Sequence, residues 1–276
     1  DLHCPRRRQR QMCIRDRSMH RTHTPAPSGP AGSRLVTLLT QLDRKAARDS
    51  HGDFAERLGR LFDLSDAISL DGANQYRPKG PFEARPDATE RLQADLLKTR
   101  DTLLAHLSRS FAGEKAASVI PLPPLKDDAQ TDKRPTVGAY ERFYQAHQRQ
   151  MIAGLSNLRQ RSRRILIGHS QAMARLAELD AVFEQSLSGY VRHCFGALPG
   201  FLEKRYRTLW DTRDPFHTVE DWLAPQGWLS QFRRELQLLL LAELDARQEP
   251  ILGLLDALVA DATGNQSTHN EVSKTV

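Results

Sequence analysis

Apolar residues recur at helical spacing through most of this chain, and no segment alternates apolar and polar residues with the period of a strand. The pattern therefore predicts an all-α protein. Spacings of three and four residues predict helices over 33–42, 53–62, 65–70, 87–111, 136–167, 170–196, 199–210, 228–248 and 250–258. Around Leu238 to Leu241 the pattern is apolar nearly all round, which is typical of a helix enclosed on several sides.

Start and stop signals refine these helices. Ser33 and Asp53 suit N-cap positions, and Asp87 with Glu90 has the spacing of a capping box. Gly168 followed by Ser170 indicates a glycine stop and then the cap of the next helix. The two long helices on either side are predicted to form an antiparallel hairpin over 136–196.

The sequence divides into five expected regions. These are a disordered leader (1–32), a smaller N-terminal helical unit (33–112), a Pro-rich linker (113–135), a C-terminal helical bundle (136–262) and a disordered tail (263–276). The hairpin and the Leu-rich helix 228–248 are expected to form the centre of an elongated bundle, and the N-terminal helices to form the smaller unit or to pack on one end of that bundle.

One alternative remains open for the Pro-rich region. Its apolar stretch VIPLPPL, residues 119–125, could dock on the helices as a polyproline strand instead of linking two domains.

Charge is distributed unevenly along the chain, whose net charge is +6. Residues 1–18 contribute +4, and their string MCIRDR resembles a translated sequencing-adaptor scar, so Met19 is the expected true start. A real basic arm for nucleic acid or an anionic surface is the alternative. Further on, residues 134–213 carry +7 and residues 214–276 carry −6, so the hairpin and the last helix are expected to lie together.

Composition limits the location and the chemistry. Without the leader only Cys194 remains, which is typical of a reducing compartment and offers no disulfide framework. No apolar run approaches the roughly 18 residues of a membrane span, and no signal peptide is recognised. A cytoplasmic protein is expected. No His, Cys, Asp or Glu spacing matches a metal site, and neither a cofactor nor a small-molecule substrate is indicated.

One motif resembles catalytic machinery. Gly168-His169-Ser170-Gln171-Ala172 is close to the G-x-S-x-G nucleophile elbow of α/β-hydrolases. That fold needs several strands, and it needs an acid followed by a histidine downstream, where this chain offers only His217 and His269. A helix turn capped by Ser170 explains the same residues, so a serine hydrolase is the weaker interpretation.

A basic cluster near the end of the helix 136–167 is the candidate interaction face; it consists of Arg159, Arg161, Arg163 and Arg164. Such a cluster could contact phosphates or a protein, but no nucleic-acid-binding signature accompanies it.

Two other features are candidates for chemistry. Asp180 and Glu184 form an i, i+4 carboxylate pair, for which Arg175 or Arg192 is the expected partner. His147 lies on the apolar stripe and is expected to be a hydrogen-bonded core or interface residue rather than a ligand.

The segments MARLAELDAVFEQSL (173–187), LPGFLEKRY (198–206) and WLSQFRRELQLLLLAELDARQEPILGLLDAL (228–258), with FAERLGRLFDLSDAISL (54–70), resemble a proteobacterial family known only as domain of unknown function 3348. The resemblance covers most of 33–260. It implies a β- or γ-proteobacterial source and an accessory role beside envelope-associated proteins, and it transfers no catalytic residue.

Taken together, the sequence favours a non-enzymatic interaction or scaffold protein. Long apolar seams of the coiled-coil kind predict a homo-oligomer or a complex with a protein partner. The alternatives are a nucleic-acid-binding protein that uses the basic helix 136–166, and a serine hydrolase that uses Ser170.

Overall fold

The computed structural model confirms an all-α fold. It describes residues 33–42, 61–78, 81–114, 116–125, 136–214 and 216–272. The leader lies outside the described residues. The described helices are α1 (Arg34–Leu42), α3 (Leu64–Asn74), α4 (Ala88–Phe111), α5 (Gly138–His169), α6 (Gln171–Gly196), α7 (Leu198–Asp211), α8 (Val219–Leu223) and α9 (Trp228–Val272).

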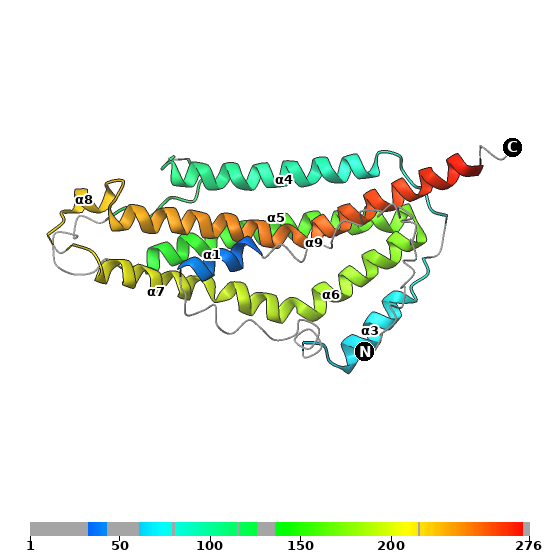
Figure 1. Ribbon diagram of the computed structural model, residues 1–276, viewed down its shortest axis with the longest axis horizontal. Coiled ribbons are helices and arrows are strands. Elements are labelled where there is room, and N and C mark those ends of the chain that lie inside the picture. The colour runs from blue at the N-terminus through cyan, green and yellow to red at the C-terminus, as the bar shows by residue number, and fades with distance from the viewer. Residues whose placement is uncertain are drawn as a thin grey trace, which may run out of the picture. The chain divides into compact units, whose positions relative to one another are not determined.

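Helix α9 forms the axis of the core. It contacts α1, α4, α5, α6, α7 and α8, and Figure 1 shows it running between α4 and α5. Its completely buried side chains include Leu229, Phe232, Leu236, Leu239 and Leu240. The expectation that the Leu-rich segment 238–241 is enclosed on several sides holds only in part: Leu239 and Leu240 are buried, but Leu238 is 42% exposed. Burial of the apolar side chains of α9 is the main source of stability here.

Helices α5 and α6 form the predicted hairpin. Ser170 lies between them with extended backbone, and its Oγ accepts a hydrogen bond from the Met173 amide at 3.2 Å. The N-cap prediction is correct. The predicted stop at Gly168 is wrong, because Gly168 and His169 continue α5 and the helix ends only where the Ser170 backbone becomes extended.

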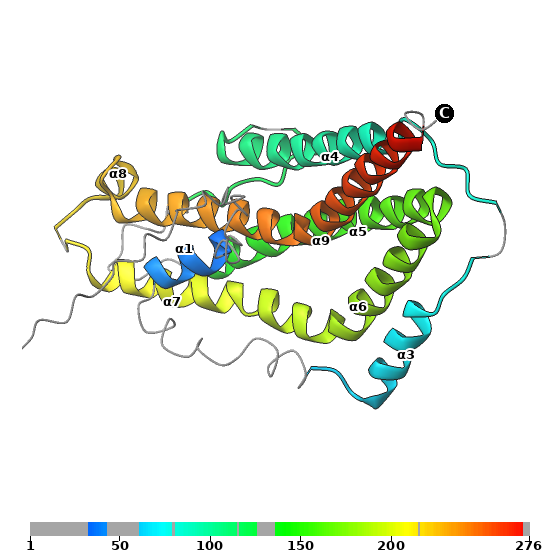
Figure 2. The same ribbon diagram turned by 45° about the vertical axis from the view of Figure 1, so that its right-hand side comes forward.

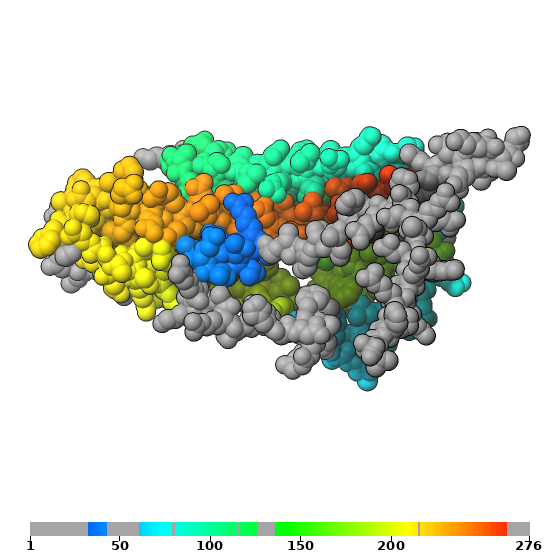
Figure 3. All heavy atoms as spheres, viewed as in Figure 1, coloured from blue at the N-terminus to red at the C-terminus, as the bar shows by residue number. Residues whose placement is uncertain are grey.

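The N-terminal helices do not pack apart from the rest. Helix α1 contacts α9, α3 contacts α6, and α4 lies along α5 and α9 (Figures 1 and 2). Figure 3 shows α1 lying over α9. The helices expected to form a smaller unit 33–112, or to pack on one end of the bundle, belong to the same compact unit as the bundle, Ser33–Val276, because their apolar faces are buried against it.

The Pro-rich segment also packs on this unit where the structure describes it. Val119 is buried, and Ile120, Leu122 and Leu125 pack against the core. Arg233 donates to the Pro123 carbonyl oxygen at 2.9 Å. The docked alternative for 119–125 therefore describes these residues better than an interdomain linker.

Two predicted helix starts are corrected. Asp87 precedes α4, but its side chain caps no amide and instead pairs with Arg91 at 2.6 Å, so there is no capping box with Glu90. A capping box begins α3, between Asp63 and Asp66. The start of the expected helix 53–62 lies outside the described residues, and only its last two residues are described.

The C-terminal part of the chain is more helical than expected. Residues 228–248 and 250–258 form one helix, α9, which passes through Pro250 and continues to Val272. The first part of the predicted disordered tail is therefore helical, because each residue added to an existing helix gains a hydrogen bond without a new nucleation cost. The segment between the predicted helices 199–210 and 228–248 also contains the short helix α8.

Candidate functional site

The predicted basic face does not remain a free basic surface. Arg159 and Arg163 bind the α6 carboxylates Asp180 and Glu184, with shortest distances of 2.6 Å for Arg159–Asp180 and 2.7 Å for Arg163–Glu184. Both guanidinium side chains are only 17% exposed. The four side chains hold the two arms of the hairpin together.

This pairing corrects the expected partners of the acidic pair. Arg175 and Arg192 lie on α6 itself, and neither forms a described ion pair with Asp180 or Glu184; Arg175 donates to the Tyr76 carbonyl and Arg192 to the Ser188 carbonyl. The hairpin places α5 alongside α6. Arginines of α5 that are distant in sequence therefore contact these carboxylates, in place of the arginines of α6.

The other two arginines of the cluster point to different neighbours. Arg161 lies 3.4 Å from Asp95 of α4. Arg164 is exposed and lines a cavity at the end of α5. The four arginines therefore do not form one continuous phosphate-binding face, and the nucleic-acid interpretation loses its main support.

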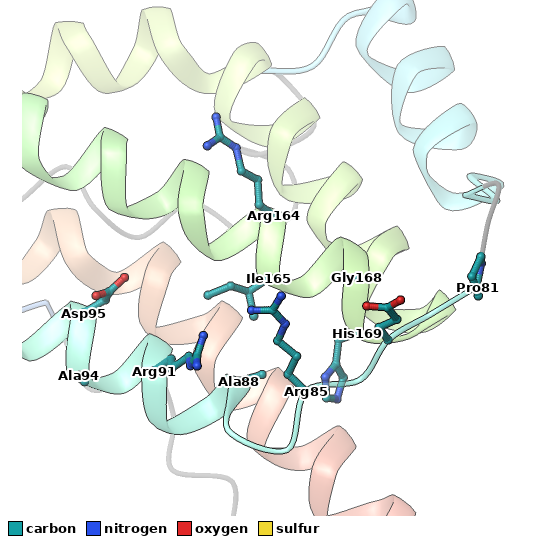
Figure 4. Close-up of a pocket in the computed structure, with 11 residues that line it drawn as sticks. Pro81, Arg85, Ala88, Arg91, Ala94, Asp95, Arg164, Ile165, Gly168 and His169 are labelled. Carbon is teal, nitrogen blue, oxygen red and sulfur yellow. The ribbon is translucent and has the colours of Figure 1, made fainter.

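The cavity that Arg164 lines lies between α5, α4 and the segment that leads into α4. Its volume is about 700 Å³, and its lining includes Arg85, Arg91 and His169. The Glu83 amide donates to the Gly168 carbonyl oxygen at 3.0 Å and so holds the leading segment against α5. Figure 4 shows Arg85 and Arg91 approaching the gap between α4 and α5 near Ile165, whereas Arg164 extends away from them.

A second concave surface, the α6 groove, lies between α5, α6 and α9 and has a volume of about 330 Å³. We define it by its lining residues Ile152, Leu155, Ser156, Arg159, Phe183, Glu184, Leu187, Ser188, Val191, Arg192, Phe195, Ala246, Arg247, Pro250 and Ile251. Most of them are apolar. The Ile152 side chain is 45% exposed and Val191 is 38% exposed, so the groove presents apolar surface to solvent.

Among the described residues, the second half of α6 is less deeply buried than the first. Met173, Ala174 and Ala177 are buried, whereas Phe183 and Leu187 are half-buried and Val191 is 38% exposed. Phe183 also packs edge-to-face on Phe62, with ring centres 5.6 Å apart. An apolar stripe that stays partly accessible is typical of an interaction surface.

A buried polar network supports one wall of the groove. Glu243 of α9 is completely buried and accepts hydrogen bonds from Tyr144 at 2.6 Å and from Gln148 at 3.0 Å. Arg247 pairs with Glu243 at 2.6 Å, and its guanidinium lies 3.8 Å from the centre of the Phe195 ring. Burial, followed by the nearby Glu243 charge, raises the pKa of Tyr144 well above its ordinary value, so its hydroxyl remains a donor.

His147 is a core residue with an unusual electrostatic environment. It is 2% exposed, it packs on Phe143 with ring centres 4.7 Å apart, and its Nε2 has no hydrogen-bond partner among the described residues. The core placement was predicted, but the expected hydrogen bond is not found at this atom. Burial, assisted by the charge of His106, lowers the pKa of His147 to about 4.

This shift predicts acid sensitivity. The unfolded chain takes up a proton near pH 6.5 but folded His147 only near pH 4, so stability falls as the pH drops through this window, by about 3 kcal/mol in total. Urea unfolding at several pH values should show that His147→Leu removes this part of the pH dependence. The matched change at the exposed His193, His193→Leu, should leave it intact; equal slopes for the two variants would contradict the assignment.

Three further observations limit the chemistry of the described residues. Ser170 Oγ serves as a helix cap, and His217 lies in a loop 3.7 Å from Asp214. No group of three or more His, Cys, Asp or Glu side chains in the described ranges could hold a metal ion. Within the same ranges, no helix has both the length and the apolar character needed to cross a bilayer.

Comparison with known families finds the same family that the sequence segments resemble. The family model of a protein of unknown function, DUF3348, matches residues 21–260. The chain belongs to the DUF3348 family. No curated protein and no solved structure matches this DUF3348 chain.

Sequence reasoning missed both concave surfaces of this DUF3348 protein. Phe183, Leu187 and Val191 were recognised as a stripe, but a single sequence does not reveal which part of a stripe stays uncovered. Arg85 lies in the Pro-rich loop before α4, where no periodicity marks a site.

Proposed function

We propose that this DUF3348 protein is a helical protein-interaction module that binds an amphipathic helix of a partner protein in the α6 groove. The observation that carries the proposal is the second half of α6, whose apolar side chains line a groove and stay partly accessible to solvent. Grooves of this kind bind helices through anchors spaced three, four and seven residues apart.

The charges around the groove favour an acidic partner. Arg192 lines the groove, and its only described contact is to a carbonyl oxygen of its own helix. Arg149 is exposed three residues before Ile152, on the same side of α5, and has no ion-pair partner among the described residues. Glu184, by contrast, is already paired with Arg159 and Arg163. A partner helix with an apolar stripe and flanking carboxylates would complement this surface.

The proposal is tested by site-specific photo-cross-linking in the native host. A photoreactive phenylalanine analogue replaces Val191 in the groove or, as a control, Val259, an equally exposed valine of α9 outside it. We expect the Val191 position to cross-link one predominant segment, with an acidic amphipathic pattern, that Val259 does not reach. Cross-links to a second copy of this chain, to residues 43–60 of the same chain, or equally from both positions would contradict a partner helix.

A charge in the groove should weaken the complex without unfolding the protein. Val191→Glu places a carboxylate where an apolar anchor is expected, and we expect it to raise the Kd for the cross-linked segment at least tenfold. Isothermal titration calorimetry measures the Kd, and circular dichroism checks the fold. Val259→Glu is the matched control and should leave the Kd unchanged; a similar effect of both variants would contradict the assigned surface.

A further inference from the structure

The cavity at the end of α5 carries an inference that is independent of the α6 groove. Its lining includes Arg85, Arg91 and Arg164 together with Glu83 and Asp95; Arg91 is also paired with Asp87, and in Figure 4 the Arg164 side chain extends away from Arg85 and Arg91. Asp95 lies within 3.4 Å of Arg161, which offsets its charge. Arg85 and Arg164 have no ion-pair partner in the part of the chain that the structure describes.

The first turn of α4 adds to the positive character of this cavity. Ala88, the first residue of that 24-residue helix, lines the cavity. The Asp87 side chain binds Arg91 and caps no amide; the Ala88 amide donates to the Arg85 carbonyl oxygen, and the next amides of α4 have no side-chain acceptor among the described residues. Unsatisfied amides at a helix N-terminus attract anions.

A third, independent group lies in the cavity wall. The His169 side chain is only 9% exposed, and its Nδ1 has no hydrogen-bond partner among the described residues. Its Nε2 lies 3.5 Å from Asp261 of α9. A buried polar atom without a partner is costly. Nδ1 itself exposes almost no surface, so it would meet a ligand in the cavity only if the His169 ring rotated.

We propose that this cavity binds a small organic phosphate. Arginine groups recognise phosphate oxygens with paired hydrogen bonds, and the α4 amides add donors on the same side. The apolar surface of Ile165, Ala88 and Pro81, and a volume of about 700 Å³, leave room for an organic group beside the phosphate. Figure 4 shows Arg85 and Arg91 close to Ile165, so charged and apolar surfaces meet in one place.

The test is a calorimetric titration of the full chain with phenyl phosphate, inorganic phosphate and phenol. We expect phenyl phosphate to bind more tightly than either of the other two. Arg85→Gln should weaken its binding at least tenfold, because an exposed guanidinium is removed without disturbing the core. Arg142→Gln, the same loss of charge at the other end of α5, should bind like the wild type.

Three results would overturn the proposal. They are no binding of phenyl phosphate, equal binding of inorganic and phenyl phosphate, and equal weakening by both variants. Co-sedimentation with phosphatidylcholine vesicles that contain phosphatidic acid distinguishes the remaining source of phosphate. We expect no Arg85-dependent sedimentation, and its presence would assign the cavity to lipid headgroups instead of a small molecule. None of these outcomes depends on the α6 groove.

Discussion

Replacing Glu243 by alanine should lower the free energy of unfolding by about 3–5 kcal/mol. The Glu243 carboxylate is completely buried and is the common acceptor for Tyr144, Gln148 and Arg247. Its removal leaves the Arg247 charge, whose side chain is 13% exposed, without its counter-ion, and leaves two buried donors without an acceptor. An uncompensated buried charge costs far more than a lost surface ion pair.

Urea unfolding followed by circular dichroism measures this effect. Glu249→Ala, on the same helix but exposed, is the matched control and should change the free energy of unfolding by less than about 0.5 kcal/mol. A loss of less than about 1 kcal/mol in Glu243→Ala would show that the network is not a main support of α5 on α9. Because Gln148 also donates to the Phe195 carbonyl, the variant should further loosen the end of α6 beside the groove.

Gly227→Ala should destabilise the protein by at least about 3 kcal/mol, because the added methyl group has no space. A Cβ at this position would lie 2.2 Å from the Asp221 carbonyl oxygen and 2.3 Å from that of Trp222. These are backbone atoms of α8, which cannot rotate away. The turn between α8 and α9 would have to open, and Trp222 and Trp228, with ring centres 5.8 Å apart, would separate.

The control substitution should change the free energy of unfolding in the opposite direction. Gly253 lies within α9, and a Cβ there meets no atom within 4 Å. Gly253→Ala should therefore stabilise the protein by roughly 0.5–1 kcal/mol, since alanine favours the helix more than glycine does. Thermal unfolding measures both effects: the melting temperature should fall in Gly227→Ala and rise in Gly253→Ala. An unchanged melting temperature in Gly227→Ala would contradict the tight turn.

Some features of the fold could be predicted from the sequence, whereas the close contact at Gly227 could not. The all-α class, the hairpin and the partly enclosed Leu-rich segment follow from the spacing of apolar residues, since burial of one face is what that spacing reflects. The clash at Gly227 depends on the approach of two backbones, and a single sequence carries no sign of it. The sequence showed only a loop with prolines and a glycine there.

Side-chain partners were the least predictable feature. The expected partners of Asp180 lay on its own helix, whereas Arg159 and Arg163 of α5 bind it. Glu243 appears in sequence as one more polar residue of an acidic helix, yet it is completely buried. Partners of this kind depend on how two helices rotate about their axes when they pack, which the apolar stripe specifies only to within a residue or two.

The α6 groove could be predicted from the sequence in part, whereas the cavity at the end of α5 could not. The apolar positions in the second half of α6 follow from the spacing along the sequence, but the degree to which each is buried needed the structure. The cavity at α4 brings residues near position 85 together with residues near position 165, so its composition depends on the packing of α4 along α5.

The central claim is that the second half of α6 is a partner-binding surface. Hydrogen–deuterium exchange of the full chain, with and without the cross-linked partner segment, tests it most directly. We predict slower exchange on binding in α6 residues 183–195 and in α5 residues 152–159, with α4 unchanged. Protection confined to α4 or to α8, with no change in α6, would contradict the account.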